Sequence, residues 1–293
     1  MKLKFTISHK LLIVIAIVLL AAGAGKLVCF NLKPLDTVIF SINNLIKSAG
    51  FEQDLQMTFR ADGKLWNSQS IADMINDTLI TAHYMKTRNA SGLDFTLSSQ
   101  SSQNTVLKGS LYTDSGLTVL TLNDKTFYSR KNRQSSITFL SSLSTSLKNY
   151  KPVFKYQTGY AIPINDYGRP SYMAMDSFST IISGDGCNDF LGALFSGFAV
   201  NDSSISINQI PPDSTGKISA IFQIDDLFRL RSIHAEISVS GASAAVDLNT
   251  RGIGGKISLA RPDISNGADI SDFSEDETGS LLKGFFESLA GGN

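Results

Sequence analysis

Histidine and cysteine are scarce in this 293-residue chain, which contains three His and two Cys. His9, His83 and His234 lack the Cys, His or Glu neighbours at the spacing that metal ligands require, so we predict no metal site. Two cysteines exclude a disulfide-rich scaffold. A bridge between Cys29 and Cys187 stays open, because the sequence does not show whether the two residues meet.

Catalytic signatures are also missing. The chain has no Gly-x-Ser-x-Gly nucleophile elbow. Residues 185–189 and 263–269 bring Asp and Asn side chains together, but neither stretch matches an EF-hand loop. We therefore predict no catalytic residues and no cofactor, and we expect a protein that is not an enzyme.

Charge is sparse, at 18% of residues, and the net charge is zero. No concentrated basic face is present, which argues against a nucleic-acid partner. The two ends of the chain nevertheless carry net charges of opposite sign. Residues 1–10 contain three lysines, whereas residues 263–293 contain seven acidic residues and one lysine.

The N-terminal region contains an uncharged apolar run, residues 11–25. If the Lys26 side chain extends its ammonium group to the lipid headgroups, the run continues through Phe30 and is long enough to cross a bilayer. The lysines precede this run, so residues 1–10 are predicted to be cytoplasmic and the bulk of the chain extracytoplasmic. Two alternatives are a cleaved signal peptide, favoured by the small residues 21–25, and a lipoprotein signal at Cys29.

Hydrophobic periodicity predicts an α+β protein. Residues 31–50 form an amphipathic juxtamembrane helix that either rises from the membrane or packs on the following domain. Two-residue alternation then predicts strands, and 3.6-residue spacing predicts helices. The expected strands are 55–61, 78–88, 93–97, 105–113, 117–122, 125–130, 205–207, 218–224, 233–239, 242–248 and 257–259, and the expected helices are 67–77, 137–150, 172–182, 188–195 and 280–290.

Short turns between these strands indicate an antiparallel meander. We expect residues 51–262 to form one extracytoplasmic domain, a curved half-barrel-like sheet with helices packed on one face. The alternative is two domains divided near residue 150. Residues 263–293 form an acidic tail that ends in the short amphipathic helix.

Two stretches resemble envelope lipid and lipoprotein carriers of the LolA/LppX-like class. The stretch Gln223-Ile-Asp-Asp-Leu-Phe-Arg-Leu-Arg-Ser-Ile233 is similar to their hairpin with an acidic turn, and Gly252-Ile-Gly-Gly-Lys-Ile-Ser-Leu-Ala-Arg-Pro262 is similar to their closing strand. The resemblance implies a half-barrel whose open side is covered by helices and holds an apolar ligand. The chain departs from the lipoprotein pattern at Val28-Cys29, so a tethered domain that works locally is expected instead of a carrier that moves between membranes.

Two groups of residues are the candidates for function. An apolar ligand would contact aromatic and aliphatic side chains of the predicted helices and strands: Phe95, Phe190, Leu194, Phe195, Phe198 and Phe222. A partner protein would dock on the apolar side of the tail helix: Leu281, Leu282, Phe285 and Phe286. The first expectation is therefore a protein anchored in the cell membrane by residues 11–30 that binds a lipid, a lipoprotein or another apolar envelope component. The alternative is an envelope assembly module that docks a protein without a small ligand.

Overall fold

The computed structural model describes residues 33–62, 69–130, 139–159, 161–166, 169–196, 216–239 and 241–271. Its helices are α2 (Pro34–Lys47), α3 (Gln69–Asn76), α4 (Phe139–Tyr150) and α5 (Asp185–Ser196). Its strands are β1 (Phe51–Ala61), β2 (Thr78–Lys86), β3 (Ala90–Ser99), β4 (Thr105–Asp114), β5 (Thr118–Leu122), β6 (Lys125–Ser129), β7 (Phe154–Gln157), β8 (Ala161–Asp166), β9 (Arg169–Ser183), β10 (Lys217–Asp225), β11 (Leu230–Val239), β12 (Ala242–Arg251) and β13 (Ala268–Asp269).

All of these strands belong to one sheet, in the order β13-β6-β5-β4-β3-β2-β1-β12-β11-β10-β9-β7, with β8 paired to β9. Strand β1 joins its two parts, because it pairs with β2 on one side and with β12 on the other. Two separate domains would not share a continuous hydrogen-bonded ladder. The strands that precede residue 150 and the strands that follow it therefore belong to one continuous ladder.

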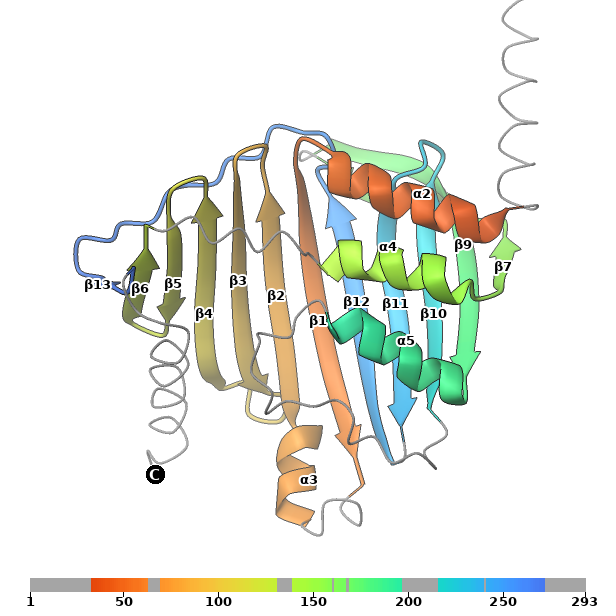
Figure 1. Cartoon of the computed structure of the whole chain (residues 1–293), viewed down its shortest axis with the longest axis horizontal. Helices are drawn as coiled ribbons and strands as arrows, with labels where there is room; N and C mark the ends of the chain where they lie inside the picture. The colour runs from red at the N-terminus through yellow and green to blue at the C-terminus, as the bar shows by residue number, and fades with distance from the viewer. Residues whose placement is uncertain are drawn as a thin grey trace, which may run out of the picture.

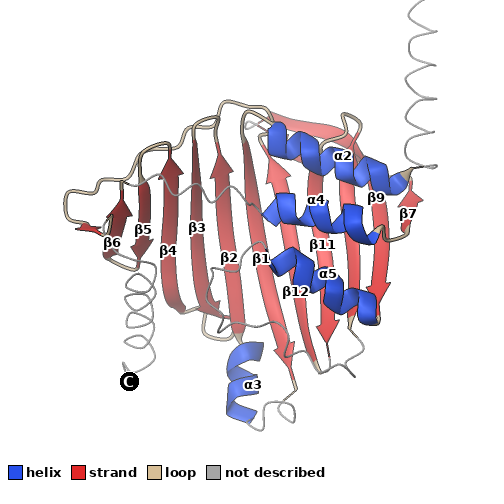
Figure 2. Ribbon diagram, in the orientation of Figure 1, coloured by secondary structure: helices blue, strands red, loops and turns tan. Residues whose placement is uncertain are grey.

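The sheet is curved and does not close into a barrel (Figure 1). Its described strand pairs are antiparallel except β13 with β6, which is parallel. Helices α2, α4 and α5 lie side by side across β9–β12 on one face, and α3 lies at the end of β1 (Figure 2). The predicted α+β class and the placement of helices on one face are confirmed.

The core lies between these three helices and the sheet. Helix α2 begins at Pro34, which fits the first turn of a helix because its missing N–H needs no partner there. Its apolar side then packs on the domain, so this helix is part of the core. The fully or almost fully buried side chains of the core include Val38, Ile42 and Leu45 from α2, Leu147 from α4, Phe190 from α5, and Phe178, Phe222, Ile224 and Leu230 from the strands.

Two local predictions are wrong. Residues 172–182, expected as a helix, lie within strand β9, where Asp176, Phe178 and Thr180 alternate as buried residues. The Ser, Thr and Ile residues of this stretch disfavour a helix, and pairing with β10 along its length selects the strand. Residues 257–259, expected as a strand, have no strand structure, because the chain turns at Gly252 and Gly254, whose φ angles are positive.

Residues 252–267 instead run along the ends of strands β1–β6 to reach β13 (Figure 1). On the way, Leu259 packs on the sheet so closely that a Cβ at Gly92 would lie 2.8 Å from its Cδ1. The predicted anchor at residues 11–30 and the predicted tail helix at 280–290 lie outside the described residues. Within the described ranges, no helix has the length and apolar character needed to span a membrane.

Candidate functional site: an open apolar face

Side chains alternate between the two faces of a sheet, so the strand register shows which residues share a face. On strands β1–β6, the residues that share the helix-bearing face are mainly apolar. We call these residues the open apolar face: Leu55, Met57, Phe59, Ile80, Ala82, Tyr84, Leu93, Phe95, Leu97, Leu107, Leu111, Leu120, Leu122 and Phe127. Leu55 and Tyr84 contact the main core, so this face continues the apolar surface that α2, α4 and α5 cover on the neighbouring strands.

The open apolar face has a regular layout. One cross-strand row contains Tyr84, Leu93, Leu111, Leu120 and Phe127, and two further rows lie below it. Six strands and three rows give a footprint of roughly 24 Å by 15 Å from standard sheet spacings. Apolar patches of this size are often functional when monomeric proteins expose them.

Polar residues border this face along the strand ends. Ser91, Thr113, Thr118 and Ser129 form a hydroxyl row at one end. Lys86 and Lys125 are the charged residues of β1–β6 that fall on this face, and both stand at its margin. An apolar centre with a polar border fits a ligand that is apolar along most of its length.

None of the described helices α2, α4 and α5 lies over strands β2–β6 (Figure 2). The side chain of Leu111 is 37% exposed, whereas Phe222 on the helix-covered strands is 2% exposed. Leu107 and Leu122 are buried by their own neighbours Phe95, Leu97 and Leu120. The open apolar face is thus a thin layer of side chains that pack on each other without a described helix above them.

Phe95 owes its position to a glycine on the next strand. Phe95 is paired with Gly109 across β3 and β4, and a Cβ at Gly109 would lie 2.2 Å from Cζ of the Phe95 ring. Any larger residue at position 109 would displace the ring. The glycine therefore lets an aromatic ring lie flat on the middle of the open apolar face.

The six predicted ligand residues do not gather in one place. Phe95 lies on the open apolar face, whereas Phe190, Leu194 and Phe222 lie in the core between the helices and the sheet, each at most 6% exposed. Phe195 belongs to α5, and Phe198 lies outside the described residues. The predicted docking residues Leu281, Leu282, Phe285 and Phe286 also lie outside them, so a protein partner at the tail stays a prediction.

Most residues of the open apolar face were missed as candidates. The alternation of Leu93, Phe95 and Leu97 predicts a strand with one buried face. It does not show which strands receive a covering helix. Only the three-dimensional arrangement reveals that this apolar face continues past the helices.

Two hollows among the described residues lie elsewhere. One, of about 570 Å³, is lined by Thr58, Arg60, Ala61, Asn76 and Gln100 beside α3. The other, of about 360 Å³, lies near Gly116, Arg130 and the segment 261–264. Both are open to solvent, and neither lies between the helices and the sheet.

On the opposite face of the sheet, β1, β2, β11 and β12 carry cross-strand ion pairs. On β4–β6 the same face is apolar, and Tyr112, Val119 and Tyr128 pack there with Leu259 and Ile264. His83 Nδ1 lies 2.7 Å from Asp54 Oδ1, and His234 Nδ1 lies 2.6 Å from Asp247 Oδ1. Arg251 Nε donates to Glu52 at 2.8 Å, an arrangement that raises the pKa of Arg251. No three potential metal ligands come together among the described residues. These pairs connect neighbouring strands on a solvated surface.

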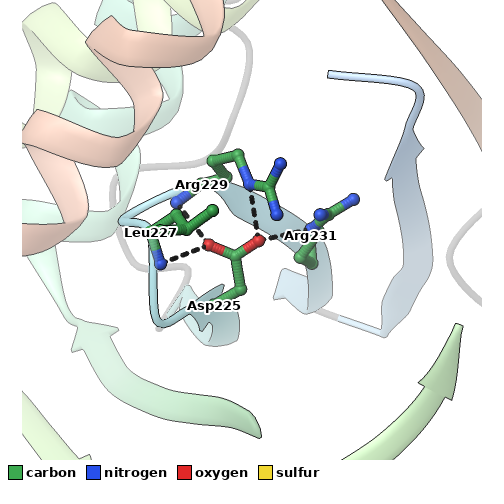
Figure 3. A network of polar contacts seen from close by, with 4 residues as sticks. All are labelled: Asp225, Leu227, Arg229 and Arg231. Carbon is green, nitrogen blue, oxygen red and sulfur yellow. Dashed lines mark hydrogen bonds and ion pairs between the residues drawn. The ribbon is translucent and has the colours of Figure 1, made fainter. Parts of the chain in front are cut away.

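The tightest polar cluster surrounds Asp225 at the turn between β10 and β11 (Figure 3). Asp225 is fully buried; its Oδ1 accepts hydrogen bonds from the backbone N–H groups of Leu227 and Arg229 at 2.9 and 3.0 Å. Its Oδ2 accepts from Nε of Arg229 at 2.7 Å and from Nε of Arg231 at 2.8 Å. A buried carboxylate is tolerated here because two guanidinium groups and two amides surround it.

Burial shifts the pKa values of two side chains that lie in or beside the helix-covered region, Cys187 and Lys86. Burial raises the pKa of the Cys187 thiol, which is a free, buried thiol at the start of α5, and this argues against a reactive nucleophile. Burial lowers the pKa of Lys86, whose Nζ donates to the carbonyl of Ile46 near the end of α2 and lies 5.6 Å from the centre of the Phe51 ring. We therefore assign both side chains to the packing of the fold and not to a reactive site.

No family model matches the sequence, and no curated protein matches it. Among solved structures, the crystal structure of a DUF1329 family protein from Desulfovibrio piger is similar over 77% of this chain and 93% of that chain. The identity is 9% and the TM-score 0.18, values too low to carry an argument about fold or family. The resemblance to LolA/LppX-like carriers therefore stays a prediction.

Proposed function

We propose that this protein is held at a cell membrane by residues 11–30 and binds a lipid, or another apolar component of the envelope, on the open apolar face. The single observation that supports this proposal is the continuation of one apolar sheet face across β2–β6, where none of the described helices covers it. A curved, unclosed sheet of this kind would bind a ligand on a shallow apolar surface, not in an enclosed pocket.

The chemistry of the face selects the class of ligand. Its centre carries no charged side chain among the described residues, so it offers no ion-pairing group to a polar small molecule. Acyl chains and similar apolar groups are stabilised by contact with Leu and Phe side chains, and this contact requires no ion-pairing group. A tethered domain would take its ligand from the adjacent bilayer.

Photo-crosslinking tests this proposal on the full chain in lipid nanodiscs. The probe is a phospholipid with a diazirine in its acyl chain, and crosslinked peptides are identified by mass spectrometry. We expect crosslinks to peptides from β3, β4 and β5 in addition to residues 11–30. Crosslinks confined to residues 11–30 would refute lipid binding by the domain.

Two matched variants make the test specific. Leu111 and Ile221 are 37% and 39% exposed and lie on opposite faces of the same sheet. Leu111→Asp places a charge on the open apolar face and should strongly reduce crosslinking to β3–β5. Ile221→Asp places the same charge on the other face and should leave crosslinking unchanged, with thermal unfolding of both variants as the control for folding.

A further inference from the structure

A second apolar surface lies where the middle of α2 meets the turn between β10 and β11. Phe40 of α2 is 53% exposed, and Leu227 in the β10–β11 turn is 64% exposed. The ring of Phe228 packs edge-on against Phe40, with centroids 5.8 Å apart. We call Phe40, Leu227 and Phe228 the apolar tip; they come from segments almost 190 positions apart in sequence. The two segments, α2 and the β10–β11 turn, lie at one edge of the molecule (Figure 1).

Hydrogen bonds to Asp225 hold the turn that presents Leu227. Phe228 has a positive φ of 56°, a conformation that costs free energy for a residue with a side chain. The Asp225 carboxylate compensates by accepting the N–H groups of Leu227 and Arg229, while the Phe228 N–H donates to the Asp225 carbonyl at 2.9 Å. The buried cluster around Asp225 thus stabilises a strained turn, and this turn exposes the Leu227 side chain to solvent.

We infer that the apolar tip inserts into the headgroup region of the bilayer that holds residues 11–30; this inference rests on the membrane attachment in the proposed function. Three residues separate Phe30 from Pro34, and the four steps between the two can span at most about 14 Å. Phe40 lies six residues further along α2, a rise of about 9 Å. The tether therefore keeps the tip close to the membrane surface.

A small apolar tip suffices for this contact, because the tether supplies a high effective concentration of bilayer. The charged residues around the apolar tip should contribute little to its contact with lipid. The exposed Lys33 and Lys47 of the α2 region are balanced by the exposed Asp36 and Asp226. We therefore expect the contact to form equally on zwitterionic and anionic lipid, driven by burial of Phe40 and Leu227.

Depth-dependent fluorescence quenching tests the inference on the full chain in phosphatidylcholine vesicles. The background variant is Trp66→Phe, which removes the single Trp of the chain. Leu227→Trp then places a reporter on the apolar tip. Val106→Trp is the matched control, because Val106 is 56% exposed and is the second residue of β4. Strand β4 lies in the part of the sheet away from α2 and the β10–β11 turn (Figure 1).

With lipids brominated in the acyl chain, we expect a blue-shifted emission and a large loss of intensity for Trp at position 227, and neither for Trp at position 106. Equal emission from the two reporters, in protein that floats with the vesicles, would overturn the apolar tip while leaving the anchor intact. Failure of the protein to float with vesicles would overturn the anchor and the tip together. Crosslinking to β3–β5 tests the ligand face separately from both outcomes.

Discussion

The two halves of the sheet present the same apolar face to different surroundings. On β9–β12, that face lies beneath α2, α4 and α5, and residues such as Phe178 and Phe222 are at most 2% exposed. On β2–β6, it has no described helix above it, and Leu111 is 37% exposed. The strand pattern is common to both halves, so the covering helices alone distinguish a core from a candidate binding surface.

The largest difference should appear when a large side chain is removed from each half. Phe222→Ala leaves a cavity under the helices and should lower the free energy of unfolding by about 3–5 kcal/mol. Leu111→Ala removes a partly solvated side chain and should cost about 1 kcal/mol. Urea unfolding followed by circular dichroism measures both. Equal losses would show that the two halves are equally packed.

The Asp225 cluster should make the covered half sensitive to loss of one charge. Asp225→Asn leaves the guanidinium groups of Arg229 and Arg231 facing a neutral amide, so we expect a loss of roughly 3 kcal/mol in unfolding free energy. Asp247→Asn removes the exposed partner of His234 and should cost at most about 1 kcal/mol. If both substitutions lowered the free energy of unfolding by a similar amount, the conclusion that Asp225 is a buried, fully paired carboxylate would be wrong.

A glycine substitution should perturb the open half mildly. Gly109→Ala forces the Phe95 ring away from β4, and we expect a loss of about 1–2 kcal/mol. The ring can swing into the space above the open half, which limits the cost. Combined with Phe95→Ala, the alanine at position 109 should cost almost nothing, and a double-mutant cycle measures the difference. Additive effects would show that the ring and the glycine do not interact.

Sequence reasoning recovered most elements because their patterns are local. Leu93, Phe95 and Leu97 alternate, and Val38, Ile42 and Leu45 follow helical spacing, so strand and helix are both predictable. It failed at residues 172–182, where Ile181 and Ile182 fit either period and pairing with β10 decides the outcome. A local hydrophobic pattern does not show which distant segment a stretch of chain will pair with.

The candidate site was less predictable than the fold. Phe190 and Phe222 were chosen because they are large and apolar, yet they share the densely packed core. Leu111 and Leu120 gave no signal beyond that of any strand residue. The acidic turn at Asp225 was noted in the sequence, but its two arginine partners become significant only when the hairpin brings them onto one carboxylate.

The smallest expected effect concerns Lys86, which stands where the two halves meet. Burial lowers its pKa in the folded state, so between that lowered value and the ordinary lysine pKa of about 10.4 the unfolded chain binds more protons. The free energy of unfolding should therefore rise with pH through this window. Lys86→Met should remove the rise, as shown by urea midpoints of the two proteins at increasing pH. A parallel pH dependence in both proteins would place the Lys86 ammonium in solvent, outside the boundary between the covered and open halves.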